Sequence, residues 1–131
     1  MKNIYYLLWV DAIVNDKSRK NNDLNWKPGL LWIITSLNSL NFLIIVMWLD
    51  YLKVYKYGFI FSFSGNSFIL GLLEALLDFF IPIGILHYLL VFYKDRYKIF
   101  IVNYPHFNGK LVLSYMFASI ILFIGTIIFM W

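Results

Sequence analysis

A chain of 131 residues with 62% hydrophobic and only 14% charged residues is too apolar for a soluble domain of its length. A soluble core of this size could not bury so much apolar surface, so the composition predicts an integral membrane protein. Because the chain contains no cysteine, disulfides, thiolate metal sites and cysteine nucleophiles are excluded. The net charge of +4 comes from cations that lie next to apolar runs. This position favours a role in membrane orientation and in binding anionic headgroups over a role in binding nucleic acid.

The first apolar segment, residues 4–14, is too short to cross a membrane. It covers eleven residues, whereas a transmembrane helix needs about twenty. A signal peptide is the alternative, because Lys2 precedes the segment. However, no small-x-small cleavage motif follows, and Asp11 interrupts the apolar run. We therefore predict an interfacial amphipathic helix that lies at the membrane surface or docks on the other helices.

Three longer apolar segments predict transmembrane helices at about residues 30–52, 68–93 and 111–131. Pro28 precedes the first span and suits the first turn of a helix, where its missing N–H would have no partner. Pro105 and Gly109 interrupt any helix that continues from the second span. The sequence thus predicts an all-α membrane protein with a single domain, 1–131, in which residues 1–29 form a cytoplasmic or interfacial segment.

The distribution of lysine and arginine predicts the orientation in the membrane. The N-terminal segment carries five cations, the first loop two and the second loop four, and none follows the third span. Nine on one side against two on the other predict a cytoplasmic N-terminus and second loop, and an external C-terminus. The cations are Lys2, Lys17, Arg19, Lys20 and Lys27, then Lys53 and Lys56, then Lys94, Arg96, Lys98 and Lys110.

Glu74 and Asp78 are the most costly residues of the second span. Their spacing of four puts them on one helix face, and a carboxylate near mid-span costs roughly 3 kcal/mol on insertion scales. Pro82 frees the backbone carbonyl of Asp78 and predicts a kink. The pair could bind a proton or cation, or it could be protonated or paired across an assembly. No lysine or arginine lies within a predicted span to neutralise the pair, which favours assembly.

His87 lies nearer the cytoplasmic end of the same span. It comes nine residues after Asp78 and so projects from roughly the opposite face. It could relay protons, but a hydrogen-bonded contact between helices is the commoner role of such a histidine. His106 lies in the second loop, and two isolated histidines without ligand spacing predict no metal site. Phosphate-binding, nucleophile-elbow and His-Glu-x-x-His motifs are missing from the sequence, which predicts no cofactor.

Polar and small residues within the spans are expected to hold the helices together. A run of hydroxyl and amide side chains in the cytoplasmic half of the first span includes Asn38 and Asn41. Such a run favours hydrogen bonds between helices over a polar path for a substrate. Two pairs of small residues, four apart, predict helix faces that pack closely. The pairs are Gly71 with Ala75, and Ser114 with Ala118.

The layout of an N-terminal amphipathic helix and three spans, with the N-terminus inside, resembles that of the small bacterial diacylglycerol and undecaprenol kinases. Their acidic motif also includes an Asn and an Ala-Ile-Glu stretch, whereas the matching region here, 73–78, reads Leu-Glu-Ala-Leu-Leu-Asp. Because only the carboxylates and the layout agree, the kinase activity is not carried over. A lipid-modifying membrane enzyme is kept as a third hypothesis.

The function that the sequence predicts is that of a small integral membrane subunit. It would pack with a partner membrane protein or with copies of itself, with Glu74 and Asp78 facing that interface. The alternative is an oligomeric proton- or ion-coupled transporter that uses these two carboxylates. Frequent Lys, Asn, Ile, Tyr and Phe with scarce Ala and Arg are typical of AT-rich bacterial coding, so a bacterial inner membrane is the expected location. The expected partners are the lipid bilayer and a membrane protein, and not nucleic acid.

Overall fold

The structure, a computed structural model, describes residues 3–21, 24–56 and 68–130, except for the side chains of 18, 68, 72, 75 and 76. All regular secondary structure in these ranges is helical. Three helical segments are long and apolar enough to cross a membrane, namely Trp26–Tyr51, Leu77–Asp95 and Lys110–Met130. The predicted all-α fold with three membrane-length apolar helices is therefore confirmed. The elements are α1 (Ile4–Asn15), α2 (Lys17–Lys20), α3 (Trp26–Tyr51), α4 (Phe68–His87), a π-helix (Tyr88–Phe92), a 3-10 turn (Tyr93–Asp95), α5 (Tyr97–Asn103) and α6 (Lys110–Met130).

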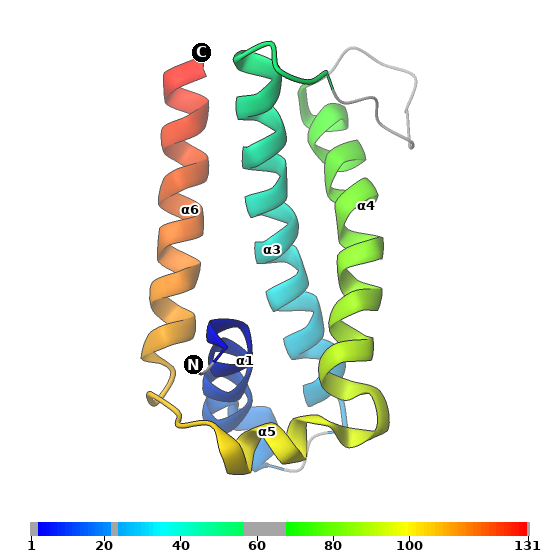
Figure 1. Cartoon of the computed structure of the whole chain (residues 1–131), viewed down its shortest axis with the longest axis vertical. Coiled ribbons are helices and arrows are strands. Elements are labelled where there is room, and N and C mark those ends of the chain that lie inside the picture. The colour runs from blue at the N-terminus through cyan, green and yellow to red at the C-terminus, as the bar shows by residue number, and fades with distance from the viewer. Residues whose placement is uncertain (1–2, 22–23, 57–67, 131) are drawn as a thin grey trace.

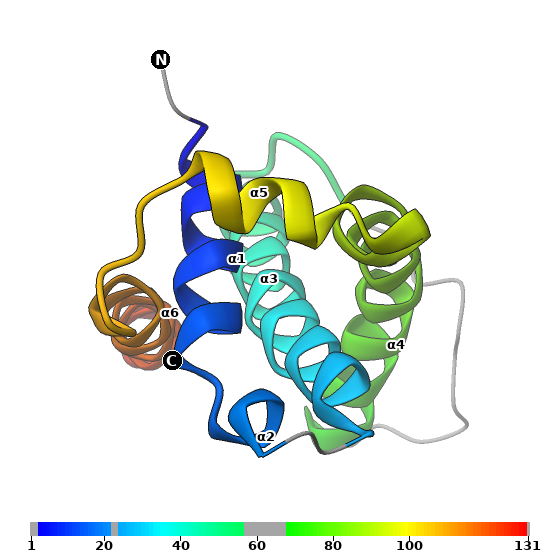
Figure 2. The ribbon, with the colours of Figure 1, turned by 90° about the horizontal axis from the view of Figure 1, so that it is seen from below.

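The three long helices stand side by side, with α3 between α4 and α6 (Figure 1). The short helix α1 lies at the end of the bundle where α3 begins, and it packs against α6 and α5 (Figure 2). Helix α5 crosses the same end. The N-terminal segment and the connection between the second and third long helices therefore lie at one end of the molecule. These two segments hold most of the cations in the sequence.

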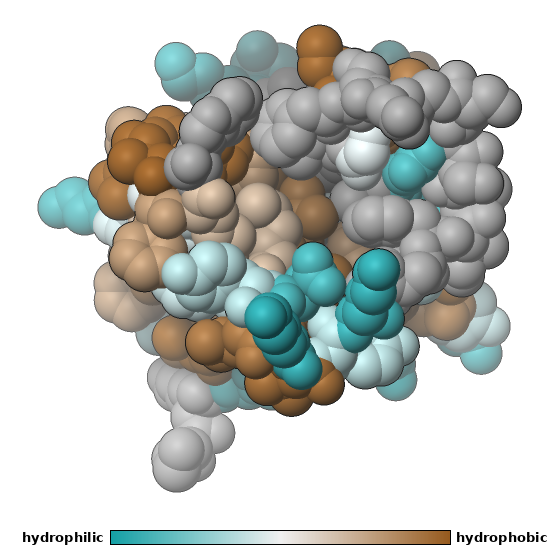
Figure 3. Space-filling model, turned by 90° about the horizontal axis from the view of Figure 1, so that it is seen from above, coloured by the Kyte–Doolittle hydropathy of each residue, from teal (hydrophilic) through white to brown (hydrophobic). Residues whose placement is uncertain are grey.

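The opposite end of the bundle carries the end of α3 and the C-terminal end of α6. Figure 3 looks onto this end, where hydrophilic side chains lie beside apolar ones. Asp50, Lys53 and Lys56 follow or end α3 here, and all three are exposed. The two ends of the fold thus differ in cation content, as the corresponding segments of the sequence do. The orientation of the two ends relative to the cytoplasm stays a prediction.

The second predicted span, 68–93, is not one continuous α-helix. Helix α4 continues through Pro82 and ends at His87, where the π-helix begins. Lys94 and Asp95 then have φ values of 52° and 56°, a left-handed conformation that ends the helical segment. The first span begins at Trp26, earlier than predicted, because the first turn of α3 accommodates Pro28.

Apolar side chains form two clusters along α3. In the larger cluster, at the α1 end, Trp9 and Ile13 of α1 pack with Ile34 of α3 and Val91 of the π-helix, and all four are almost fully buried. The second cluster lies further along α3 and includes Phe79 of α4. Helix α1 is thus docked on the bundle by its own core residues. Its depth relative to the membrane surface stays a prediction.

Asp11, the residue that interrupts the apolar run of α1, is fully buried and caps α6. Its Oδ1 accepts hydrogen bonds from the backbone N–H groups of Phe107 and Gly109, the latter at 3.0 Å. Its Oδ2 accepts from those of Leu111 at 2.9 Å and Val112 at 3.2 Å. The first N–H groups of a helix have no partner within it, and negative charge there interacts favourably with the helix dipole. The carboxylate therefore joins two elements that are distant in sequence.

Gly109 allows this close approach of α1 to the start of α6. Its φ of +80° lies in the left-handed region that favours glycine. A Cβ atom at this position would also collide with the side chain of Asn15, at the end of α1. Both the backbone conformation and the available space therefore require glycine here.

Asp11→Asn is expected to lower the free energy of unfolding by about 2 kcal/mol, because an amide offers one neutral acceptor oxygen to four N–H groups. Titration of the purified protein with SDS in detergent micelles, followed by circular dichroism, measures this change. The control is Asp50→Asn, which alters an exposed carboxylate at the other end of α3 and is expected to cost less than about 0.5 kcal/mol. Equal losses for the two variants would contradict the capping role.

Candidate functional site

His87 of α4 lies in a polar contact with α3, where it is 2% exposed. Its Nδ1 atom lies 3.3 Å from Oγ1 of Thr35, and its Nε2 atom lies 3.0 Å from Nδ2 of Asn38. An amide nitrogen only donates, so Nε2 accepts and the ring proton is assigned to Nδ1, which donates to Thr35. His87 is therefore a neutral imidazole held between two side chains of α3. In this tautomer it does not act as a base toward the Thr35 hydroxyl.

The hydrogen bonds continue from α3 to α6. The hydroxyl of Tyr115 donates to Oδ1 of Asn38 and accepts from Nδ2 of Asn41 at 2.7 Å. Asn41 also donates to Oγ of Ser119 at 2.9 Å, and that hydroxyl donates to the backbone carbonyl of Tyr115. One connected set of bonds thus links three helices. We call it the polar cluster, formed by Thr35, Asn38, Asn41, His87, Tyr115 and Ser119.

A further bond joins α3 and α6 beyond the polar cluster. Nε1 of Trp48 donates to Oγ1 of Thr126 at 3.1 Å. Tyr115, Ser119 and Thr126 are spaced by four and seven residues and therefore share one face of α6. This face is the one by which α6 attaches to the bundle.

Two rings of α1 cover His87 at the end of the polar cluster. The ring centroids of Tyr5 and Trp9 lie 5.7 Å and 5.3 Å from that of His87. Tyr5 Oη and Trp9 Nε1 are buried without a hydrogen-bond partner among the described residues, an arrangement that costs about 1–3 kcal/mol for each group. Burial raises the pKa of Tyr5 to about 12. The tyrosine therefore stays neutral and covers the imidazole as an aromatic ring.

A cavity of about 460 Å³ lies beside the polar cluster. Asn38 and Tyr115 form part of its wall, and most of the remaining wall is apolar. This wall has the composition of a site for an apolar group with one polar end. Its other lining residues are Ile4, Tyr5 and Leu8 of α1, and Leu111 and Ser114 of α6.

Asp78 lies inside the bundle and is 6% exposed. The next residue, Phe79, packs against Leu43 and Val46 of α3. Glu74, one turn earlier, is half-buried, and both carboxylates interact with other residues. The fold thus keeps Asp78 away from lipid, as the cost of a carboxylate at membrane depth requires. Ion binding and assembly at this pair both stay predictions.

The small residues singled out from the sequence lie mostly at the surface of the bundle. A Cβ atom built on Gly71 would meet nothing within 4 Å. Ser114 and Ala118 are exposed, and the side chain of Ala75 lies outside the described residues. The close approach between α3 and α4 is made instead at Gly84, where an added Cβ would lie 3.4 Å from Cγ2 of Thr35. Gly71, Ser114 and Ala118 are therefore available to another helix.

His106 is exposed in the second loop. Within the described ranges, the His, Asp and Glu side chains form no group of three that could hold a metal ion. The two histidines of the sequence thus lie in different surroundings, one buried in the polar cluster and one at the surface.

The sequence did not predict the role of several residues of the site. Asp11 was interpreted only as an interruption of an apolar run, and Tyr115 and Ser119 were not singled out. Their spacing was the available signal, because Tyr115, Ser119 and Thr126 repeat on α6 much as Asn38, Asn41 and Trp48 do on the first span. Two polar faces of matching period predict a hydrogen-bonded helix pair.

Comparisons with protein-family models, with curated proteins and with solved structures give no match for this chain. Its function is therefore inferred from the geometry of its own residues.

Tyr115→Phe is expected to lower the free energy of unfolding by about 1 kcal/mol, because Asn38 and Asn41 each lose a partner inside the bundle. Tyr5→Phe, the matched control, deletes a buried hydroxyl that has no partner and is expected to leave stability unchanged or higher. SDS titration in micelles compares the two variants. A greater loss for Tyr5→Phe than for Tyr115→Phe would rule out the assigned bonds.

Proposed function

We propose that this chain is a small subunit of a bacterial inner-membrane complex and packs with a partner membrane protein or with copies of itself. In this proposal the end that carries α1 and α5 faces the cytoplasm, in agreement with the excess of lysine and arginine in these segments. The observation that carries the proposal is an uncovered face of α6 that is lined by small residues.

Helix α6 is the least covered of the three long helices. In its most apolar stretch 11% of the residues are buried, compared with 39% in α3. Apolar residues alone would be compatible with lipid on this surface, because lipid tails are as apolar as leucine. The type of residue on the uncovered face is therefore what supports a protein partner.

Small residues line one side of α6. Ser114 and Ala118 are exposed, and a Cβ atom built on Gly125 would meet nothing within 4 Å. Spacings of four and seven residues put the three positions within about 40° of one another around the helix. Small residues let a second backbone approach closely, and such faces are enriched where membrane helices associate. This face of α6, with Ser114, Ala118 and Gly125, is the proposed contact surface.

The attachment of α6 to the bundle, about 100° around the helix from the small residues, supports the same proposal. Its polar face bonds to Asn41 and Trp48 of α3, as described above. Rotation of α6 about its own axis would break these bonds, so the small face is held in a defined direction. A preorganised face loses less conformational freedom when a partner binds.

Ala118→Leu is expected to weaken the association several-fold, because the added bulk separates the two backbones. The control is Ile120→Phe, which adds bulk about 200° around the helix, on the other side of the buried Ser119. Extraction in a mild detergent and light scattering measure the mass of the assembly for wild type and both variants. A wild-type chain that is monomeric and alone at native abundance would overturn the proposal.

The alternative is a proton- or ion-coupled transporter, and the burial of Asp78 is the observation that favours it. An oxygen ligand that is shielded from lipid at membrane depth is what ion coupling uses. For a subunit with a purely structural carboxylate, vesicles with wild type and with Asp78→Asn are expected to lose a pH gradient at the same rate. Faster loss with wild type, abolished in an Asp78→Asn variant of unchanged mass, would support the transporter.

A further inference from the structure

A second cavity, of about 450 Å³, lies at the α1 end of the bundle, between the start of α3 and the π-helix. Its apolar wall consists of Pro28 and Leu31 of α3 and of Tyr88 and Phe92 of the π-helix. Tyr88 is half exposed, whereas Phe92 is buried. The cavity thus lies between two membrane-length helices, with apolar side chains on both sides.

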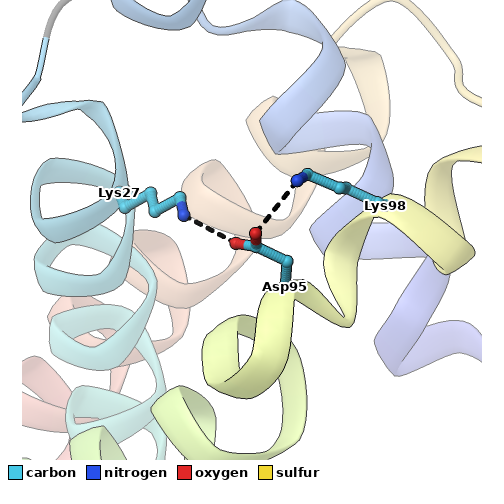
Figure 4. A network of polar contacts seen from close by, with 3 residues as sticks. All are labelled: Lys27, Asp95 and Lys98. Atoms are coloured by element: carbon cyan, nitrogen blue, oxygen red, sulfur yellow. Dashed lines mark hydrogen bonds and ion pairs between the residues drawn. The ribbon is translucent and has the colours of Figure 1, made fainter.

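Lysines gather at the polar end of this cavity. Lys27, Lys94 and Asp95 complete its lining. Nζ of Lys27 lies 2.8 Å from Oδ1 of Asp95, and Nζ of Lys98 lies 2.9 Å from Oδ2 (Figure 4). The hydrogen bond to Asp95 raises the pKa of Lys98, which is therefore charged at neutral pH. Lys27 and Lys98 share one carboxylate, and Lys94 lines the same cavity without an ion pair, so this end has an excess of positive charge.

The backbone at Lys94 and Asp95 brings these charges together. Both residues have left-handed φ values, which turn the chain from the π-helix toward α5. Asp95 thereby reaches α3, and each of its two carboxylate oxygens pairs with a lysine. Lys94 contacts the ring of Tyr93, with Nζ 5.3 Å from the ring centroid. Within the described residues, its ammonium group forms no ion pair with a carboxylate.

We propose that this cavity binds an anionic phospholipid of the membrane that the chain spans. The phosphate lies against Lys27 and Lys94, and one acyl chain lies against Leu31, Tyr88 and Phe92. Basic pockets between transmembrane helices on the cytoplasmic side are suited to anionic headgroups. Lysine stems also reach from the apolar region toward the headgroups.

Two further features agree with an anion at this position. The start of α3 is the positive end of a 26-residue helix dipole, and its first turn contains no acidic residue. The Asp95 carboxylate lies close to the proposed phosphate, but two lysines neutralise it. The apolar wall favours a lipid over free phosphate, because free phosphate has no apolar part to cover Leu31 and Phe92.

Native mass spectrometry of the full chain in neutral detergent tests this proposal with phosphatidylglycerol and phosphatidylcholine of identical acyl chains. Wild type is expected to retain several-fold more phosphatidylglycerol than phosphatidylcholine. Lys94→Gln is expected to reduce this retention about five-fold, since one cation near an anionic surface contributes about that factor. Lys94→Arg is expected to keep it. Lys56→Gln, which removes an exposed cation beyond the other end of α3, is the control and is expected to bind as wild type does.

A second variant tests the apolar wall. Leu31→Trp narrows the cavity and leaves every lysine in place, so it is expected to lose bound phosphatidylglycerol while unfolding at the wild-type temperature. Equal retention of the two lipids by wild type, or equal losses in Lys94→Gln and Lys56→Gln, would overturn the proposal. Displacement of the lipid by an equal concentration of inorganic phosphate would also overturn it. The same holds if an acidic protein, and not a lipid, is bound at Lys94.

Discussion

The carboxylate of Asp11 accepts four backbone N–H groups at the start of α6, and it does so from a fully buried position. Where water is scarce, an unpaired backbone group costs several kcal/mol, so the beginning of an apolar helix needs a partner. The chain supplies that partner from its first helix. Because Trp9 and Ile13 of the same helix fill the larger apolar cluster, the cap and the core depend on one another.

The polar cluster holds α3 to both of its long neighbours, α4 and α6. Helix association within a membrane has little hydrophobic driving force and depends on packing and on hydrogen bonds. Helix α3 contributes two amides and a threonine, and His87, Tyr115 and Ser119 complete the set. The buried polar side chains of the cluster thereby find partners within the chain. The cost of burying them is offset by bonds that also fix the rotation of each helix.

The two proposed binding surfaces lie on different elements. The small face of α6 is suited to another helix, whereas the cavity between α3 and the π-helix is suited to a phospholipid. Lys94 does not belong to the α6 face, and Ala118 does not line the cavity. Assembly and lipid binding are therefore separable by single substitutions.

The sequence by itself determined the membrane character of the chain, its three apolar spans and the uneven distribution of cations. These properties depend on composition and on the length of apolar runs, which need no knowledge of contacts. It also predicted hydrogen bonds for Asn38, Asn41 and His87, because polar groups in apolar spans must find partners. Only the tertiary structure decided which partners they have. It brought Asp11 to α6, Asn38 to His87 and Lys27 to Asp95, because these pairs are distant in sequence and no local pattern encodes their meeting.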